Sequence, residues 1–195
     1  ETETQPPETS RAKVLWNLTP INNVNKVIAV ASGKGGVGKS TVTAALALSL
    51  AQRGVSVGII DADIYGPSIP HMLGLAGSGK PELDQNNLMI PKVAGCVQCM
   101  SVGLILDPRQ GDIHLSMVQQ VPLAFNGGGA VIVTTPSEVA LLDARKCAAM
   151  FAKTHVPLLG VIENMSWFED ASGARIPVFG TGGGAALAEE LGTPL

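Results

Sequence analysis

Residues 33–40 form a glycine-rich segment, GKGGVGKS, that fits the pattern G-x-x-x-x-G-K-S/T at every position. The apolar run 27–31 precedes it, and a stretch with helical spacing, 41–53, follows it. A strand that turns through glycines into a helix directs several backbone N–H groups into one concavity, where polyphosphate binds. The lysine of such a loop reaches the β- and γ-phosphates, and its last hydroxyl binds Mg²⁺. The residues expected to bind nucleotide are Gly33, Lys34, Gly35, Gly36, Val37, Gly38, Lys39, Ser40 and Thr41.

A pair of carboxylates, Asp61 and Asp63, follows the next apolar run, 55–60. A strand, a helix and a second strand in this order predict a right-handed crossover in a parallel sheet, and so a doubly wound α/β fold. Ligands of such sheets bind at the carboxyl ends of the strands. Carboxylates there can hold waters of a Mg²⁺ shell or orient the water that attacks a γ-phosphate. The alternative is that both aspartates cap the following turn.

An asparagine and the cysteines are the other groups whose chemistry could matter. Asn164 follows the strand predicted at 158–162, and its amide can donate and accept at once, which suits an adenine edge; a loop-capping asparagine is the alternative. Cys96 and Cys99 form a C-x-x-C, but residues three apart on a flat strand point to opposite faces. The pair could therefore chelate a metal only if Gly95 forms a turn, and we expect buried thiols there and at Cys147.

The composition indicates one α/β domain and excludes several classes of partner. A chain of 195 residues is too short for two ordinary domains, so we expect a flexible arm at 1–25 and a single domain at 26–195. A net charge of −3 without basic runs, and 4% aromatic residues, argue against nucleic acid and anionic membranes. No apolar run is long enough for a membrane span. Three cysteines fit a reducing compartment: the cytoplasm or, after removal of a targeting segment, the mitochondrial matrix.

Two segments, KGGVGKST at 34–41 and DADIYGPSIP at 61–70, resemble the Mrp/ApbC family of iron–sulfur cluster carriers, which also has mitochondrial members. This family lies within the class of MinD, ParA and the nitrogenase iron protein, whose phosphate loop is a deviant Walker A. The resemblance implies a P-loop NTPase fold with a mainly parallel sheet. It also implies an ATPase that binds ATP and Mg²⁺ and acts as an ATP-controlled homodimer on iron–sulfur client apoproteins.

The resemblance assigns roles to individual residues. The extra lysine of the class, matched by Lys34, reaches across the dimer interface to the partner's nucleotide; a solvated surface lysine is the alternative. Asp63 matches the switch I aspartate, so the expected catalytic residues are Lys34, Lys39 and Asp63. Asp61 matches the preceding carboxylate, which is expected to hold water in the outer shell of Mg²⁺. The matching asparagine of the family contacts adenine, which implies the same role for Asn164.

The chain departs from the family after residue 106. Relatives have a helix and a buried strand that ends in D-x-P-P-G-T-G-D, the source of their Walker B and switch II carboxylates. About thirty to forty residues are missing here, from the usual length of such a strand and helix. Asp112 matches the last residue of that phrase and is a candidate Mg²⁺ ligand. Residues 102–106 are expected to form a strand, so that Asp107 could replace the Walker B residue; a plain loop is the alternative.

A second departure concerns the iron–sulfur cluster. After Trp167 and Phe168, relatives carry a C-x-x-C that holds a cluster between two subunits, whereas this chain has Glu169 and Asp170. Such clusters require thiolate or imidazole ligands, so we expect no cluster ligands at the family position.

The predicted function is that of an ATP-binding and ATP-hydrolysing iron–sulfur cluster carrier or assembly factor, whose hydrolysis could be impaired without the Walker B segment. Two alternatives are a nucleotide-binding scaffold without turnover and a positioning ATPase like MinD or ParA.

Overall fold

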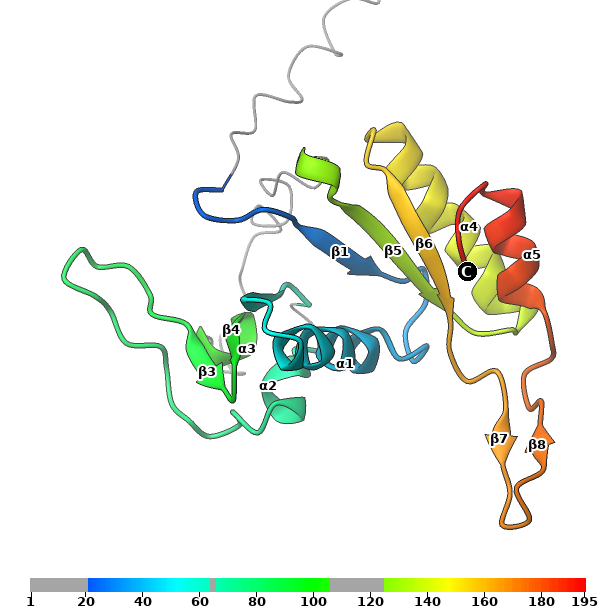
Figure 1. Ribbon diagram of the computed structural model, residues 1–195, viewed down its shortest axis with the longest axis horizontal. Helices are drawn as coiled ribbons and strands as arrows, with labels where there is room; N and C mark the ends of the chain where they lie inside the picture. The colour runs from blue at the N-terminus through cyan, green and yellow to red at the C-terminus, as the bar shows by residue number, and fades with distance from the viewer. Residues whose placement is uncertain (1–20, 64–65, 106–124) are drawn as a thin grey trace, which may run out of the picture.

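The first sheet carries the strand that leads into the glycine-rich segment. A computed structural model describes residues 21–63, 66–105 and 125–195 of the chain. In it β1 (Ile28–Ala31), β5 (Gly129–Thr134) and β6 (Leu158–Glu163) form a parallel sheet in the order β1-β5-β6 (Figure 1). These strands are near-continuous apolar runs, which is typical of parallel strands, and the central strand β5 is the most buried.

Two helices cover this sheet, α4 (Glu138–Lys153) and α5 (Gly183–Glu190), and they also pack against each other (Figure 1). The side chain of Ser137 caps α4 by accepting a hydrogen bond from the backbone of Ala140. The buried side chains between the helices and the sheet form the main core, which consists of Ala130, Ile132, Leu141, Ala144, Cys147, Ala148, Phe151, Val156, Val161, Leu187 and Ala188.

A second sheet has the order β2-β4-β3, from β2 (Val57–Asp61), β4 (Val97–Ser101) and β3 (Lys92–Ala94). Strands β2 and β4 are parallel, and β3 is antiparallel to β4. Helices α1 (Lys39–Gln52) and α2 (Ile69–Met72) pack on this sheet through a core of Ala47, Ile59, Ile69, Leu75, Val97 and Cys99. The fold is thus the expected doubly wound, mainly parallel α/β structure, but its strands are divided between two sheets.

Between the two sheets the strand ladder is interrupted. Among the described strands, β1 pairs with β5 and β2 pairs with β4, and no ladder joins β1 to β2. Ile60 of β2 is 64% exposed, which is unusual because parallel sheets are normally covered on both faces. The prediction of a strand at 102–106 is wrong, because β4 ends at Ser101 and Val102–Ile105 form the short helix α3. Asp107, Asp112 and residues 1–20 of the predicted arm lie outside the described residues.

Helix α1 connects the two halves. Its Val42 packs on a small core of Val37, Val133 and Ala140 at the first sheet, while its Ala47 packs against the second sheet. Beyond this body, β7 (Phe168–Glu169) and β8 (Arg175–Ile176) form a projecting hairpin, and a short 3-10 helix (Phe125–Gly127) precedes β5 (Figure 1). In the described part of the chain, no helix has the length and apolar character needed to cross a membrane.

The close packing of the glycine-rich segment on α4 gives a test of the fold. A Cβ on Gly33 would collide with the backbone carbonyl of Asp143, whereas a Cβ on Gly35 would meet open space. We expect Gly33→Ala to lower the free energy of unfolding by about 1–3 kcal/mol, and the matched Gly35→Ala by less than about 1 kcal/mol. Urea unfolding followed by circular dichroism measures both, and equal stabilities would contradict this packing.

Candidate nucleotide-binding site

The glycine-rich segment forms the loop between β1 and α1, and its backbone has the shape of a phosphate-binding concavity. Gly36 (φ 80°) and Gly38 (φ 90°) adopt the left-handed conformation that favours glycine. Gly38 is the N-cap residue of α1 and provides no side-chain cap. The first N–H groups of a helix lack partners within it, so here they are available to an anion. Val37, 4% exposed, packs against the first sheet and anchors the loop.

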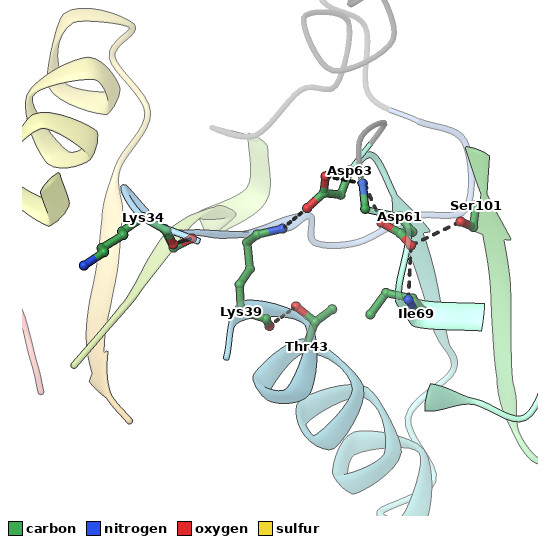
Figure 2. Close-up of polar contacts among 9 residues, drawn as sticks. Lys34, Lys39, Thr43, Asp61, Asp63, Ile69 and Ser101 are labelled. Atoms are coloured by element: carbon green, nitrogen blue, oxygen red, sulfur yellow. Dashed lines mark hydrogen bonds and ion pairs between the residues drawn. The ribbon is translucent and has the colours of Figure 1, made fainter. Parts of the chain in front are cut away.

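Lys39 begins α1 and reaches across the front of the loop to the second sheet. Its Nζ forms an ion pair with Oδ2 of Asp63 at 3.1 Å (Figure 2). The side chains are 31% and 36% exposed, so the pair contributes only about 0–1 kcal/mol to stability. Oδ1 of Asp63 accepts a hydrogen bond from the backbone of Gly66 at 3.2 Å. The structure therefore brings together two of the three predicted catalytic residues, in a contact weak enough for a phosphate to replace.

Asp61 is buried and has several internal donors. It accepts hydrogen bonds from the hydroxyl of Ser101 (3.1 Å) and from the backbone N–H groups of Ile69 and Asp63 (both 3.2 Å; Figure 2). These contacts fix the segment that carries Asp63, so Asp61 acts in the structure as a positioning residue. Sequence reasoning missed Ser101; only the register that places Ser101 beside Asp61 on neighbouring strands reveals it.

Asn164 lies against the loop from the end of β6. Its Nδ2 donates to the carbonyl oxygen of Val37 at 2.9 Å, and its backbone N–H donates to Thr134 at 2.8 Å. The structure thus places Asn164 against the glycine-rich loop. Its expected contact with adenine stays a prediction. The bond to Val37 was not anticipated.

The remaining predicted loop residues lie around this concavity. Lys34 is exposed, and its side chain points away from Lys39 and Asp63 (Figure 2). Its carbonyl oxygen accepts a hydrogen bond from the hydroxyl of Ser32 at 3.0 Å. Ser40 and Thr41 occupy the first turn of α1, where a hydroxyl can face an ion held with the phosphates. Lys34 is therefore directed away from the site formed by its own loop.

The three cysteines differ in exposure. Gly95 (φ 59°) helps to form a turn between β3 and β4, and Cys96 in this turn is exposed, which makes its predicted burial wrong. Cys99 and Cys147 are buried as predicted. Burial raises the pKa of both thiols, with a smaller contribution from the charge of Asp61 at Cys99, so both are poor thiolate donors at neutral pH. Over the described ranges, no group of three or more His, Cys, Asp or Glu residues could hold a metal ion.

The charged groups of the β7–β8 hairpin, where the family resemblance implies cluster cysteines, make contacts within the hairpin. Asp170 accepts hydrogen bonds from the hydroxyl of Ser172 (2.6 Å) and from the backbone of Ser172 and Ala174, which lower its pKa. Arg175 stacks over the ring of Trp167, 4.4 Å from the centroid, and lies 3.9 Å from Glu169. Asp170 therefore stabilises the turn through its hydrogen bonds, whereas the exposed pair of Glu169 and Arg175 adds little.

Comparisons with known proteins agree with this geometry. The family model described as "ParA: NUBPL iron-transfer P-loop NTPase" matches residues 23–110 and 106–195. The iron–sulfur cluster carrier protein of Synechocystis is 38% identical over 228 residues, covering 96% of this chain and 64% of that protein. The protein of the same name from Escherichia coli is 41% identical over 220 residues, covering 94% and 58%. A nucleotide-binding protein from Archaeoglobus fulgidus, solved in complex with ADP, has a TM-score of 0.72 and 35% identity, covering 87% and 79%.

The alignments also locate what this chain lacks. Spans of 228 and 220 positions exceed a chain of 195 residues, so these relatives contain residues that have no counterpart here. The two family matches meet at residues 106–110, where the sequence predicted a missing strand and helix. The chain spans about three fifths of the length of these two relatives. The predicted family and fold class are confirmed, and the chain belongs to the ParA family, in the group described as NUBPL iron-transfer P-loop NTPases.

Proposed function

We propose that this chain is an ATP-binding and ATP-hydrolysing domain that controls iron–sulfur cluster transfer by dimerising with ATP. The observation that carries the proposal is the loop of residues 33–40, with two glycines in the left-handed conformation, an open helix N-terminus and the Nζ of Lys39 in front. Polyphosphate is the ligand that matches such a set of donors.

Binding of the phosphates exchanges one partner of Lys39 for another. The ammonium group leaves the carboxylate of Asp63 for the β- and γ-phosphate oxygens, since a more highly charged anion in the concavity competes better for it. The carboxylate of Asp63 then lies beside the γ-phosphate, where it can orient the attacking water. Asp61 keeps its segment in place through Ser101 and Ile69.

Oxygen ligands suited to Mg²⁺ are present at the same end of the site. The hydroxyl of Ser40 is the protein ligand that would hold the ion, which shields the charge of the phosphates when bound. Asp61 and Asp63 lie at the same end of the site as Ser40, and their carboxylates can accept hydrogen bonds from water bound to Mg²⁺. Asp112 stays a candidate ligand on the basis of the sequence alone.

The dimer and the cargo extend this proposal beyond one chain. Lys34 points out of its own site, as a lysine that completes a partner's site would. The relatives are named as iron–sulfur cluster carriers, which supports iron–sulfur apoproteins as clients. We infer the cytoplasm as the compartment, with the mitochondrial matrix as the alternative. The hairpin of β7 and β8 offers Glu169 and Asp170, which suit iron–sulfur cargo poorly because its ligands are thiolates or imidazoles. We therefore place control by ATP in this chain and cluster ligands elsewhere.

Loss of the loop lysine tests nucleotide binding. Lys39→Ala removes the charge-assisted hydrogen bonds to phosphate, so we expect the affinity for Mg-ATP to fall by about 100-fold or more. The matched Lys146→Ala removes another lysine that forms an ion pair, on α4 far along the chain, and should leave the affinity unchanged. Isothermal titration calorimetry measures both. Equal affinities of wild type and Lys39→Ala would refute the proposed site. If the wild type binds ATP but releases no phosphate in a separate hydrolysis assay, the result would favour a scaffold without turnover.

Removal of the outward-pointing lysine tests the dimer. We expect the wild type to shift from monomer to dimer when ATP is added, and Lys34→Ala to bind ATP but stay monomeric. Lys80→Ala, which changes an exposed lysine in another loop, should behave as wild type. Sedimentation velocity with and without ATP gives the fractions of monomer and dimer. If Lys34→Ala dimerises with ATP as well as the wild type does, the role across the subunit interface is wrong.

Reconstitution tests the assignment of cluster ligands. After anaerobic incubation with iron and sulfide, we expect this chain alone to hold no stable bridging cluster, because the hairpin lacks thiolates and Cys99 is buried. Any weak binding should disappear in Cys96→Ala. Iron and sulfide content and visible absorbance after desalting are the readouts. About four irons per dimer, as in a 4Fe–4S cluster, unaffected by Cys96→Ala and Cys99→Ala, would contradict the assignment.

A further inference from the structure

The hydrogen bond between Asn164 and the phosphate loop points to a function for this side chain that does not involve a base. We propose that Asn164 is a positioning residue for phosphate binding, because it holds the peptide group of Val37 and Gly38 in the orientation that the bound phosphates need. The inference rests on the proposed nucleotide site and deepens it. Asn164 would then act on the triphosphate as well as on the base.

Asn164 is itself held firmly. Its backbone N–H donates to the carbonyl oxygen of Thr134 at the end of β5, so the residue continues the pairing of β5 with β6. The preceding residue, Glu163, accepts a hydrogen bond from the backbone N–H of Gly184 at 2.5 Å, at the start of α5. The side chain of Asn164 therefore extends to the loop from a position fixed by the first sheet and α5.

The loop is shaped around the carboxamide of Asn164. A Cβ on Gly38 would collide with Nδ2 of Asn164, so the amide occupies the space that a side chain at position 38 would need. Gly38 also has φ 90°, which disfavours any other residue. The side chain of Val37 is packed with Val133 and Ala140, and its carbonyl oxygen receives Nδ2 at 2.9 Å. Gly38 and Asn164 are thus a matched pair in this structure.

The contact of Asn164 with the Val37 carbonyl also sets the orientation of the Gly38 N–H, because both belong to one peptide group. A carbonyl oxygen can only accept, so the NH₂ group of Asn164 must face Val37 and the amide oxygen faces elsewhere. Because a trans peptide is planar, its C=O and the following N–H point in opposite directions. Fixing the carbonyl of Val37 therefore fixes the direction of the Gly38 N–H, one of the loop donors available to phosphate. Without Asn164 this peptide could rotate and turn that donor away.

Tripolyphosphate, which has no base or sugar, separates the two possible roles of Asn164. We would titrate wild type, Asn164→Ala and Asn164→Leu, which keeps the branched skeleton without the polar atoms, with Mg-tripolyphosphate and Mg-ATP. Thermal unfolding of each variant corrects for the folded fraction. Loss of one hydrogen bond predicts an affinity for tripolyphosphate that is about three- to tenfold lower in both variants. Ser166→Ala, two residues further in the same loop, is the matched control and should stay within about twofold of wild type. Among the described residues, its hydroxyl donates to the carbonyl of Glu163 and not to the glycine-rich loop.

The outcomes distinguish this inference from the proposed function. Unchanged binding of tripolyphosphate by the Asn164 variants, with a loss confined to ATP, would overturn the inference and leave the nucleotide site intact. A wild type that binds neither ligand would refute the nucleotide site and the inference together. Should both variants unfold, the inference can be tested in wild type by nuclear magnetic resonance. The measured quantity is the coupling across the hydrogen bond from Nδ2 of Asn164 to the carbonyl of Val37. The coupling should persist with tripolyphosphate bound, and its disappearance would overturn the inference.

Discussion

The geometry of the site depends on two side-chain contacts to the glycine-rich loop, one from just beyond the end of each sheet. Asn164 at the end of β6 binds the carbonyl of Val37, and Asp63 after β2 pairs with Lys39. Helix α1 packs on both sheets, but the side-chain bonds of the loop are the contacts that a polyphosphate would change. If Lys39 exchanged Asp63 for a phosphate, the loop would lose its ion pair with the segment that follows the second sheet. The bond of Asn164 would still attach the loop to the first sheet.

The sequence predicted the parts of the fold and site that are encoded by contiguous residues. The loop, the strands on either side of α1 and the end of that helix at Gly54 (φ 81°) all follow from local pattern. Contacts between distant segments were not predictable, because nothing in a single sequence places Asn164 beside Val37 or Ser101 beside Asp61. The strand expected at 102–106 became a helix since a short apolar run does not distinguish the two. Gly103 also packs closely against Pro67 there, which is a tertiary contact.

The segment that relatives have and this chain lacks has a physical consequence. A doubly wound sheet is covered on both faces by its crossover helices, so a missing strand and helix leave an edge and a face without their usual neighbours. The break between β1 and β2 among the described strands, together with exposed Ile60, fits such a loss. The phosphate loop, β1 and α1 lie before the missing segment in the chain, and the contacts that shape the loop come from β2, β5 and β6. The nucleotide site can therefore keep its geometry although the sheet is interrupted.

A crystal structure of this chain with Mg²⁺ and a non-hydrolysable ATP analogue is the most direct measurement of this account. We expect the triphosphate in the loop of residues 33–40, Nζ of Lys39 on a phosphate oxygen and no longer 3.1 Å from Asp63, and Nδ2 of Asn164 still on the carbonyl of Val37. A triphosphate bound elsewhere, or a lysine that keeps its contact with Asp63 while the analogue occupies the loop, would contradict it.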